Sequence, residues 1–211
     1  MTVLVIGASR GIGRDTVRAT LKAGHRVRAF ARSADSLPIR HPNLERWRGD
    51  ALNPDDVAAA LVGVQTVIQT LGVSARALME PVTLFSEATR VLLPAMEHQG
   101  VRRLITVTGF GAGDCRSAIS CPQRVPFRLL LGRAYDDKSV QEELIKASAL
   151  DWTIVRPGIL VGGPGFGRYA VLTEPHEWRN GVIARRDVAR FLVRQITDTT
   201  HIHKAPVLVW G

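Results

Sequence analysis

Short runs of apolar and β-branched residues alternate along the chain with longer segments in which apolar residues recur at helical spacing. The short runs are typical of strands, and they lie at residues 3–6, 26–31, 44–47, 66–69, 103–108, 153–156 and 207–210. The longer segments predict amphipathic helices over residues 11–23, 83–98, 134–148 and 188–196. A further short helix is predicted from Asn53 and Pro54 onward, because a capping residue followed by Pro suits a helix start.

This order of elements predicts an α/β fold. Strands that alternate with helices pair in parallel, because each connection must carry the chain back across the sheet. No repeat, low-complexity tract or linker-like segment divides the chain. We therefore expect a three-layer, doubly wound parallel sheet, the Rossmann fold, formed by a single domain over residues 1–211. Ligands of such sheets bind at the carboxyl ends of the strands, so the residues that follow each strand are the first candidates for function.

The composition excludes several classes of protein. A chain of 211 residues with 45% hydrophobic residues can bury a sizeable core and is not a disordered polymer. Cys115 and Cys121 lie in a stretch rich in Gly, Ser and Pro without a cluster of histidines, so we expect ordinary thiols and no metal site. No run approaches the roughly 18 apolar residues of a membrane span, and no cationic leader precedes the first strand. We therefore expect a cytoplasmic protein with no membrane partner.

The net charge is strongly positive, because 28 Lys and Arg residues against 19 Asp and Glu residues give a formal value of +9. Cations gathered in one patch would indicate a nucleic-acid partner. Here the Arg residues are dispersed, mostly in ones and twos, and no basic stripe with interleaved aromatic residues is present. The sequence therefore predicts no nucleic-acid partner.

The segment V-L-V-I-G-A-S-R-G-I-G joins the first predicted strand to the first predicted helix through a glycine-bearing turn. Gly7 permits a tight turn, Gly11 lets the backbone approach a pyrophosphate, and Gly13 lets the helix lie close to the sheet. A bland alternative is a tight packing corner without a ligand. The pattern favours binding of a dinucleotide, and the residues expected to hold it are Gly7, Ala8, Ser9, Arg10, Gly11, Ile12 and Gly13.

The end of the second strand distinguishes NADP from NAD. An acidic residue there hydrogen-bonds the ribose 2′-hydroxyl, whereas an Arg there pairs with a 2′-phosphate. The chain has Arg32 and Ser33 at this place, and Arg10 in the glycine turn offers a second guanidinium. The sequence therefore favours NADP over NAD. Solvated surface charges are the alternative interpretation of both Arg residues.

Two further strand ends carry weaker signals for the same ligand. Asp50 and Ala51 follow the third strand, where an adenine ring would lie, and the Asp50 carboxylate is a candidate acceptor for its exocyclic amine. Asp50 is equally able to start a turn. Leu71 and Gly72 follow the fourth strand, where a small residue lets the backbone pass close to a ribose.

Several motifs together carry a family resemblance that covers almost the whole chain. Besides the glycine turn they are R-G-D-A, V-x-x-V-I-Q-T-L-G, D-K-x-x-x-E, D-W-T-I-V-R-P-G-I-L and I-A-R-R-D-V-A. With these motifs the chain resembles the short-chain dehydrogenase/reductase superfamily, specifically its atypical members of the NAD(P)H-binding, NmrA-like and biliverdin reductase B or flavin reductase type. The resemblance implies that the backbone of Pro157, Gly158 and Ile159 runs past the nicotinamide.

The resemblance also implies candidate catalytic residues. It places Lys138 where a Lys binds the nicotinamide ribose, and Thr108 where a hydroxyl polarises the substrate. The Tyr-x-x-x-Lys dyad of the superfamily is absent, since Ala134 stands four residues before Lys138 and Tyr135 stands three before it. Tyr135 is the remaining candidate proton donor, with its phenol turned by about one helical step. The alternatives are an exposed helix lysine for Lys138 and a strand packing residue for Thr108.

Two glycine-rich stretches, residues 109–127 and 157–170, are expected to be loops on the substrate side of the cleft. Their aromatic residues Phe110, Phe166 and Tyr169 are candidates to stack on a flat substrate, or to pack in the core or in a lid.

The sequence favours an NADPH-dependent oxidoreductase that delivers hydride to a flavin, quinone or similar planar acceptor, because such chemistry needs little proton transfer by the protein. The alternative is a non-catalytic NADP(H)-binding redox sensor or an assembly or regulatory protein. A nucleotide-sugar epimerase or dehydratase is disfavoured. Those enzymes usually carry a larger C-terminal substrate domain, whereas only about 55 residues follow Arg156 here. The expected partner is a small-molecule acceptor, and we expect a monomer or a homodimer.

Overall fold

The computed structural model of this chain describes residues 1–73, 82–119 and 121–211. For residues 121–130 the description covers the course of the helix and not the side chains.

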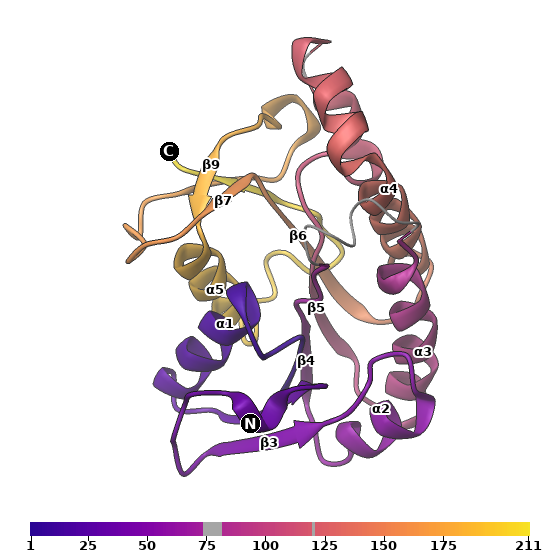
Figure 1. Cartoon of the computed structure of the whole chain (residues 1–211), viewed down its shortest axis with the longest axis vertical. Coiled ribbons are helices and arrows are strands. Elements are labelled where there is room, and N and C mark those ends of the chain that lie inside the picture. Colours follow the sequence, from indigo (N-terminus) through magenta and orange to yellow (C-terminus); the bar gives the residue numbers. More distant parts are fainter. Residues whose placement is uncertain (74–81, 120) are drawn as a thin grey trace.

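A mixed, mostly parallel sheet of eight strands forms the middle layer of the described structure, with the strand order β3-β2-β1-β4-β5-β6-β10-β8. Neighbouring strands are parallel except for β8, which runs antiparallel to β10 at the edge. A separate parallel pair, β7 (Ile159–Val161) with β9 (Val182–Ala184), lies above α5 (Figure 1). The strands of the large sheet are β1 (Thr2–Ile6), β2 (Arg26–Ala31), β3 (Leu44–Arg48), β4 (Thr66–Gln69), β5 (Arg103–Val107), β6 (Asp151–Pro157), β8 (Ala170–Leu172) and β10 (Val207–Val209).

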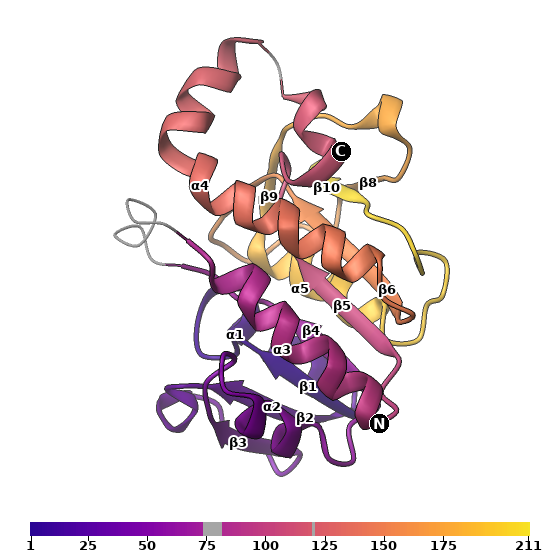
Figure 2. The ribbon, with the colours of Figure 1, turned by 90° about the vertical axis from the view of Figure 1, so that its right-hand side faces the viewer.

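Helices cover both faces of the sheet, so the predicted three-layer, doubly wound arrangement is confirmed. On one face α1 (Gly11–Lys22) packs beside α5 (Arg185–Arg194), and on the other α2 (Pro54–Leu61), α3 (Leu84–His98) and α4 (Cys121–Lys146) lie in a row (Figures 1 and 2). Short 3-10 turns are η1 (Ala34–Ser36), η3 (Gly113–Ala118) and η4 (Pro175–Glu177).

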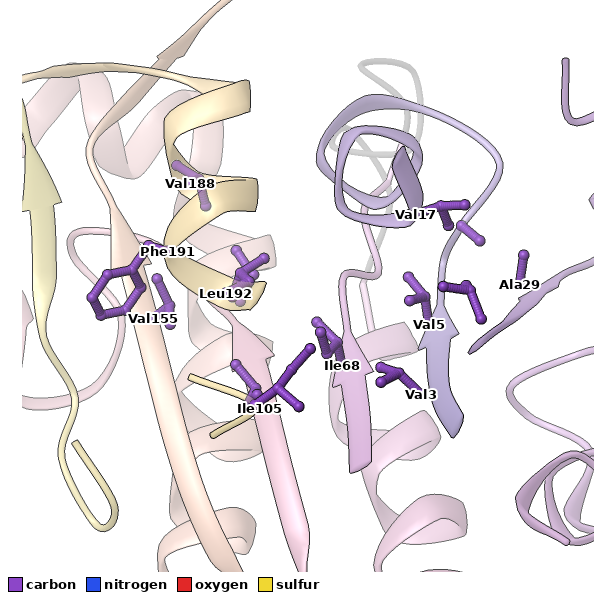
Figure 3. Close-up of a cluster of buried hydrophobic side chains, with 14 of the residues drawn as sticks. Val3, Val5, Val17, Ala29, Ile68, Ile105, Val155, Val188, Phe191 and Leu192 are labelled. Carbon is purple, nitrogen blue, oxygen red and sulfur yellow. The ribbon is translucent and has the colours of Figure 1, made fainter. Parts of the chain in front are cut away.

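Two apolar clusters hold these layers together, and residues of one strand alternate between them because successive side chains of a strand point to opposite faces. Val3 and Val5 of β1 face α1 and α5, where they join the side chains drawn in Figure 3. Leu4 and Ile6 face α2 and α3. Fully buried β-branched and aliphatic residues on both faces are what a covered parallel sheet requires.

Most predicted element boundaries agree with the structure to within two residues, since periodicity and end signals are local properties. The side chain of Asn53 caps α2 as expected, accepting hydrogen bonds from the backbone N–H groups of Asp55 at 2.9 Å and Asp56 at 3.4 Å. The glycine at position 24 follows α1 with a positive φ of 84°.

The two predicted loops are only partly loops. The stretch 109–127 contains η3 and the first turns of α4, which begins at Cys121 rather than at residue 134. Pro122 stands in the first turn of that helix, where a missing N–H group is tolerated. The stretch 157–170 contains β7, a strand of three residues that is too short for a periodic signal.

Within the described residues, no helix combines the length and the apolar character that crossing a membrane requires.

Candidate functional site

A cleft of about 670 Å³ opens at the carboxyl ends of β1 to β5, the edge where the sequence predicts ligand binding. Five adjacent strands contribute to its walls, together with the starts of α1, α3 and α5. Its lining residues are Ile6, Gly7, Ser9, Arg10, Gly11, Ile12, Phe30, Ala31, Arg32, Ser33, Gly49, Asp50, Ala51, Leu52, Thr70, Leu71, Gly72, Val73, Leu84, Val107, Thr108, Lys138, Leu160 and Arg185.

The glycine turn has a geometry that other residues would not fit. Gly7 has a φ of 83°, and a Cβ there would lie 2.8 Å from the carbonyl oxygen of Thr70. A Cβ at Gly13 would lie 2.1 Å from the carbonyl oxygen of Gly7. These two glycines therefore let the turn and α1 approach β4 closely, as the fingerprint of a dinucleotide-binding turn requires.

Gly11, unlike Gly7 and Gly13, is not required by the packing of the turn. It has a φ of 56°, lines the cleft, and a Cβ there would meet no atom of the described structure within 4 Å. No acidic residue occupies the first turn of α1, and the Arg10 side chain makes no capping hydrogen bond. The N–H groups of that turn are thus available to an anion.

The electrostatics of the cleft suit a polyanion. Of the residues that the structure describes, Arg10, Arg32, Lys138 and Arg185 line it, against one carboxylate, that of Asp50. One oxygen of Asp50 already accepts a hydrogen bond from the backbone N–H of Leu52 at 3.1 Å. Asp50 thus starts a turn, which was the alternative to binding adenine. It also lines the cleft.

Lys138 reaches the cleft from α4. Its ammonium donates a hydrogen bond to the backbone oxygen of Thr108 and lies 4.9 Å from the ring centre of Phe85 and 5.1 Å from that of Tyr135. Burial lowers the pKa of Lys138 to about 8, although the charge of Glu142 acts in the opposite direction. A negative group brought into the cleft would stabilise the charged form of this side chain.

The surroundings of Tyr135 in the structure do not favour its predicted role as a proton donor, which stays a prediction. Tyr135 does not line the cleft, and its hydroxyl packs against Gly109, where a Cβ would lie 2.5 Å from it. Burial raises the pKa of Tyr135 to about 12. At a spacing of three residues the Lys138 ammonium lies over the face of the Tyr135 ring, and burial is the main cause of the raised phenol pKa.

Thr108 lines the cleft, but its hydroxyl is not arranged to polarise a substrate. Thr108 Oγ1 lies 2.7 Å from Glu142 Oε1, and the carboxylate can only accept. The hydroxyl proton is therefore directed at Glu142. The sequence could not show this partner, because the two residues are 34 positions apart.

Glu142 belongs to a buried network of ion pairs. Glu142 and Arg156 both lie in motifs quoted above, but the sequence did not show that they pair. The Arg156 side chain is fully buried, its Nε donates to Glu142 Oε1 at 3.0 Å, and its Nη2 pairs with both Glu142 and Asp114. Burial alone would lower the pKa of Arg156, but the hydrogen bond and charge of Glu142 raise it. Arg156 also lies 5.1 Å from the ring centre of Trp178. The network fixes β6, α4 and η3 behind the cleft.

Not every residue predicted for the cofactor lines the cleft. Ala8 and Gly13 belong to the glycine turn and the start of α1 but are buried, so they do not face the cleft. The backbone of Pro157, Gly158 and Ile159 is instead used in pairing, with Phe110, Leu208 and Gly181 respectively. These three residues do not line the cleft, whereas the next residue, Leu160, does, and the course of their backbone past a nicotinamide stays a prediction.

Sequence reasoning missed other lining residues for two reasons. Some flank the predicted residues by one or two positions at a strand end and were within reach of the same signal: Ile6, Phe30, Ala31, Gly49, Leu52, Thr70, Val73 and Val107. Leu84, Leu160 and Arg185 were not selected, because only packing brings the starts of α3 and α5 and the strand β7 to this edge, although Leu160 and Arg185 lie within motifs quoted above.

The three aromatic candidates do not line the cleft. Phe110 is buried in a small cluster with Cys115 and Ile119, and Tyr169 packs edge-on against Phe191 at 6.2 Å. Phe110 and Tyr169 therefore pack within the protein, which was the alternative to stacking on a flat substrate. Phe166 is exposed and contacts Trp210 edge-on at 5.3 Å.

The thiol of Cys115 is buried, which raises its pKa, in keeping with an ordinary thiol. Among the described residues, no group of His, Cys, Asp and Glu is arranged to hold a metal ion. The side chain of Cys121 lies outside the described part.

Comparison with known proteins gives a family description that agrees with a dinucleotide-binding cleft. A family model described as NAD(P)H-binding matches residues 7–199. The chain is 26% identical to the uncharacterized sugar epimerase YhfK of Bacillus subtilis, over 100% of this chain and 95% of that protein. It is 33% identical to a 3-beta-hydroxysteroid dehydrogenase of Mycolicibacterium neoaurum over 67% of this chain, and spans only 41% of that protein's length. An epimerase name therefore occurs for a relative of about the same length as this chain.

Among solved structures, ChuY of Escherichia coli O157:H7, described as an anaerobillin reductase, has the same fold. The TM-score is 0.81, the sequence identity is 23%, and the match covers 100% of this chain and 98% of that chain.

Proposed function

This chain belongs to the NAD(P)H-binding family, and we propose that it is an NADPH-dependent oxidoreductase that transfers hydride to a flavin, a quinone or a similar planar acceptor. The observation that carries the proposal is the cleft at the end of β1, where the uncapped first turn of α1 and four cationic side chains surround a space of dinucleotide size. Several phosphate charges of one ligand would satisfy these groups together.

The preference for NADPH over NADH rests on the end of β2. Arg32 and Ser33 line the cleft directly after that strand, and Arg10 lines it from the glycine turn. An acidic residue that would hydrogen-bond the ribose 2′-hydroxyl of NADH is missing at this place. The guanidinium groups of Arg32 and Arg10 are the candidates to bind a 2′-phosphate, which accepts charge-assisted hydrogen bonds.

The acceptor class follows from the proton chemistry of the cleft. Within the described part of the chain no phenol or imidazole lines it, the Thr108 hydroxyl donates to Glu142, and the Lys138 ammonium is held by the backbone oxygen of Thr108. A ketone or sugar substrate needs a positioned proton donor, whereas a reduced flavin or quinone takes its protons from water after the hydride has arrived. The site therefore suits an acceptor whose reduction needs orientation more than acid catalysis.

Steady-state oxidation of NADPH with FMN, FAD or menadione as the acceptor tests this function directly. We expect consumption of NADPH that saturates with at least one of these acceptors and is slower with NADH at the same concentration. A protein that binds NADPH and reduces none of them would instead be a redox sensor or an assembly factor. A protein that binds no dinucleotide in calorimetry would contradict the proposal as a whole.

Arg32→Asp is expected to reverse the cofactor preference. The substitution removes a partner of the 2′-phosphate and offers a carboxylate to a 2′-hydroxyl, so the ratio of the Kd for NADH to the Kd for NADPH should fall by about 10- to 100-fold, as loss of one or two charge-assisted hydrogen bonds implies. Calorimetric titration with both cofactors measures the ratio. Arg40→Asp, at an exposed Arg that does not line the cleft, makes the same change of net charge and should leave the ratio within about twofold.

A further inference from the structure

The hydroxyl of Thr108 has a fixed hydrogen-bond polarity. It lies 2.7 Å from Glu142 Oε1, and a carboxylate accepts hydrogen bonds but offers no proton in return. A threonine hydroxyl carries one proton and two lone pairs, so donation to Glu142 leaves only lone pairs for any other partner.

The surroundings hold this polarity in place. Glu142 is buried and receives Nε and Nη2 of the fully buried Arg156, and the Lys146 ammonium lies 3.8 Å from Glu142 Oε2. The Glu142 carboxylate therefore accepts hydrogen bonds from Arg156 as well as from Thr108. The other polar groups of Thr108 are also occupied, since its N–H donates to the Val155 oxygen and its carbonyl oxygen accepts from Lys138.

We propose that Thr108 accepts a hydrogen bond from the carboxamide N–H of the bound nicotinamide, and that Glu142 is the positioning residue that makes its hydroxyl an acceptor. The proposal rests on the proposed function, because it requires a nicotinamide ring at this end of the cleft. The carboxamide offers two N–H donors and one carbonyl oxygen, so a site that presents lone pairs binds its NH2 side. Through this contact the Glu142–Arg156 pair would set which way the carboxamide turns.

A pair of ligands that differ only in that donor tests the assignment. NADP⁺ and its 3-acetylpyridine analogue both present a carbonyl oxygen, but the analogue has a methyl group where the carboxamide has NH2. We expect Thr108→Val to weaken NADP⁺ by about fivefold to tenfold, the effect of one lost hydrogen bond that leaves a donor unpaired, and to change the Kd of the analogue by less than about twofold. Thr108→Ser, which keeps the hydroxyl, should behave as the wild type with both ligands.

The remaining outcomes overturn the assignment in identifiable ways. Equal weakening of both ligands would mean that the hydroxyl donates to the carbonyl oxygen, and no change with either would mean that Thr108 does not contact the ring. Failure of the wild type to bind either ligand would contradict the proposed function instead. Thr108→Ala serves as a second variant if Thr108→Val unfolds, and thermal unfolding of each variant shows that the fold is intact.

Discussion

Gly11→Val should abolish dinucleotide binding while the protein stays folded. Gly11 lines the cleft at the start of α1, and a side chain there would project into open space rather than into the protein. That space is where the pyrophosphate must approach the backbone N–H groups, so the branched side chain would exclude it. We expect the affinity for NADPH, measured by calorimetry, to fall by about 100-fold or more, which corresponds to about 2.7 kcal/mol.

Gly24→Val is the matched control, because it separates loss of the ligand from backbone strain. Gly24 also has a positive φ, 84° against 56° at Gly11, and a Cβ there also meets no described atom within 4 Å. Both substitutions therefore carry a strain of the same kind, of roughly 1–2 kcal/mol. Gly24 lies after α1, away from the cleft, so its variant should lose stability but keep its affinity. Equal loss of affinity in both variants would show that strain, and not exclusion of a phosphate, is responsible.

Arg156→Leu should destabilise the protein severely. The substitution leaves the buried carboxylate of Glu142 without its main partner and removes one partner of Asp114. Breaking a buried ion pair from one side costs about 3–5 kcal/mol. For a chain of this size that corresponds to a fall of roughly 6–20 °C in Tm, which differential scanning calorimetry would measure.

Two controls distinguish an uncompensated buried charge from other causes. In the double variant Glu142→Leu with Arg156→Leu no such charge remains, so it should be more stable than Arg156→Leu alone. Arg102→Leu breaks an exposed ion pair with Asp151 at 3.3 Å and should cost no more than about 1 kcal/mol. A small effect of Arg156→Leu, comparable with that of Arg102→Leu, would mean that water reaches the network and solvates Glu142.

The sequence alone determined the fold class and one end of the candidate site. Alternation of β-branched runs with helical periodicity predicted the layered parallel sheet, and the glycines at 7, 11 and 13 predicted a ligand site at the end of β1, where the cleft lies. The cleft also contains Arg32 and Asp50, which were selected because they follow strands. These features are local, or follow from the single rule that parallel strands end at a common edge, so a linear pattern carries them.

Only the tertiary structure decided which hydrogen bonds and charges the side chains at the other end of the cleft can offer. Tyr135, Thr108 and Lys138 were candidates because of their motifs, but the roles that they can take depend on Gly109, Glu142 and the rings beside Lys138. The contact between Thr108 and Glu142 spans 34 positions, and that between Asp114 and Arg156 spans 42. Hydrogen-bond polarity and burial are set by such distant partners, because the direction of a proton and the cost of a charge depend on what surrounds the group in space and not on its neighbours along the chain.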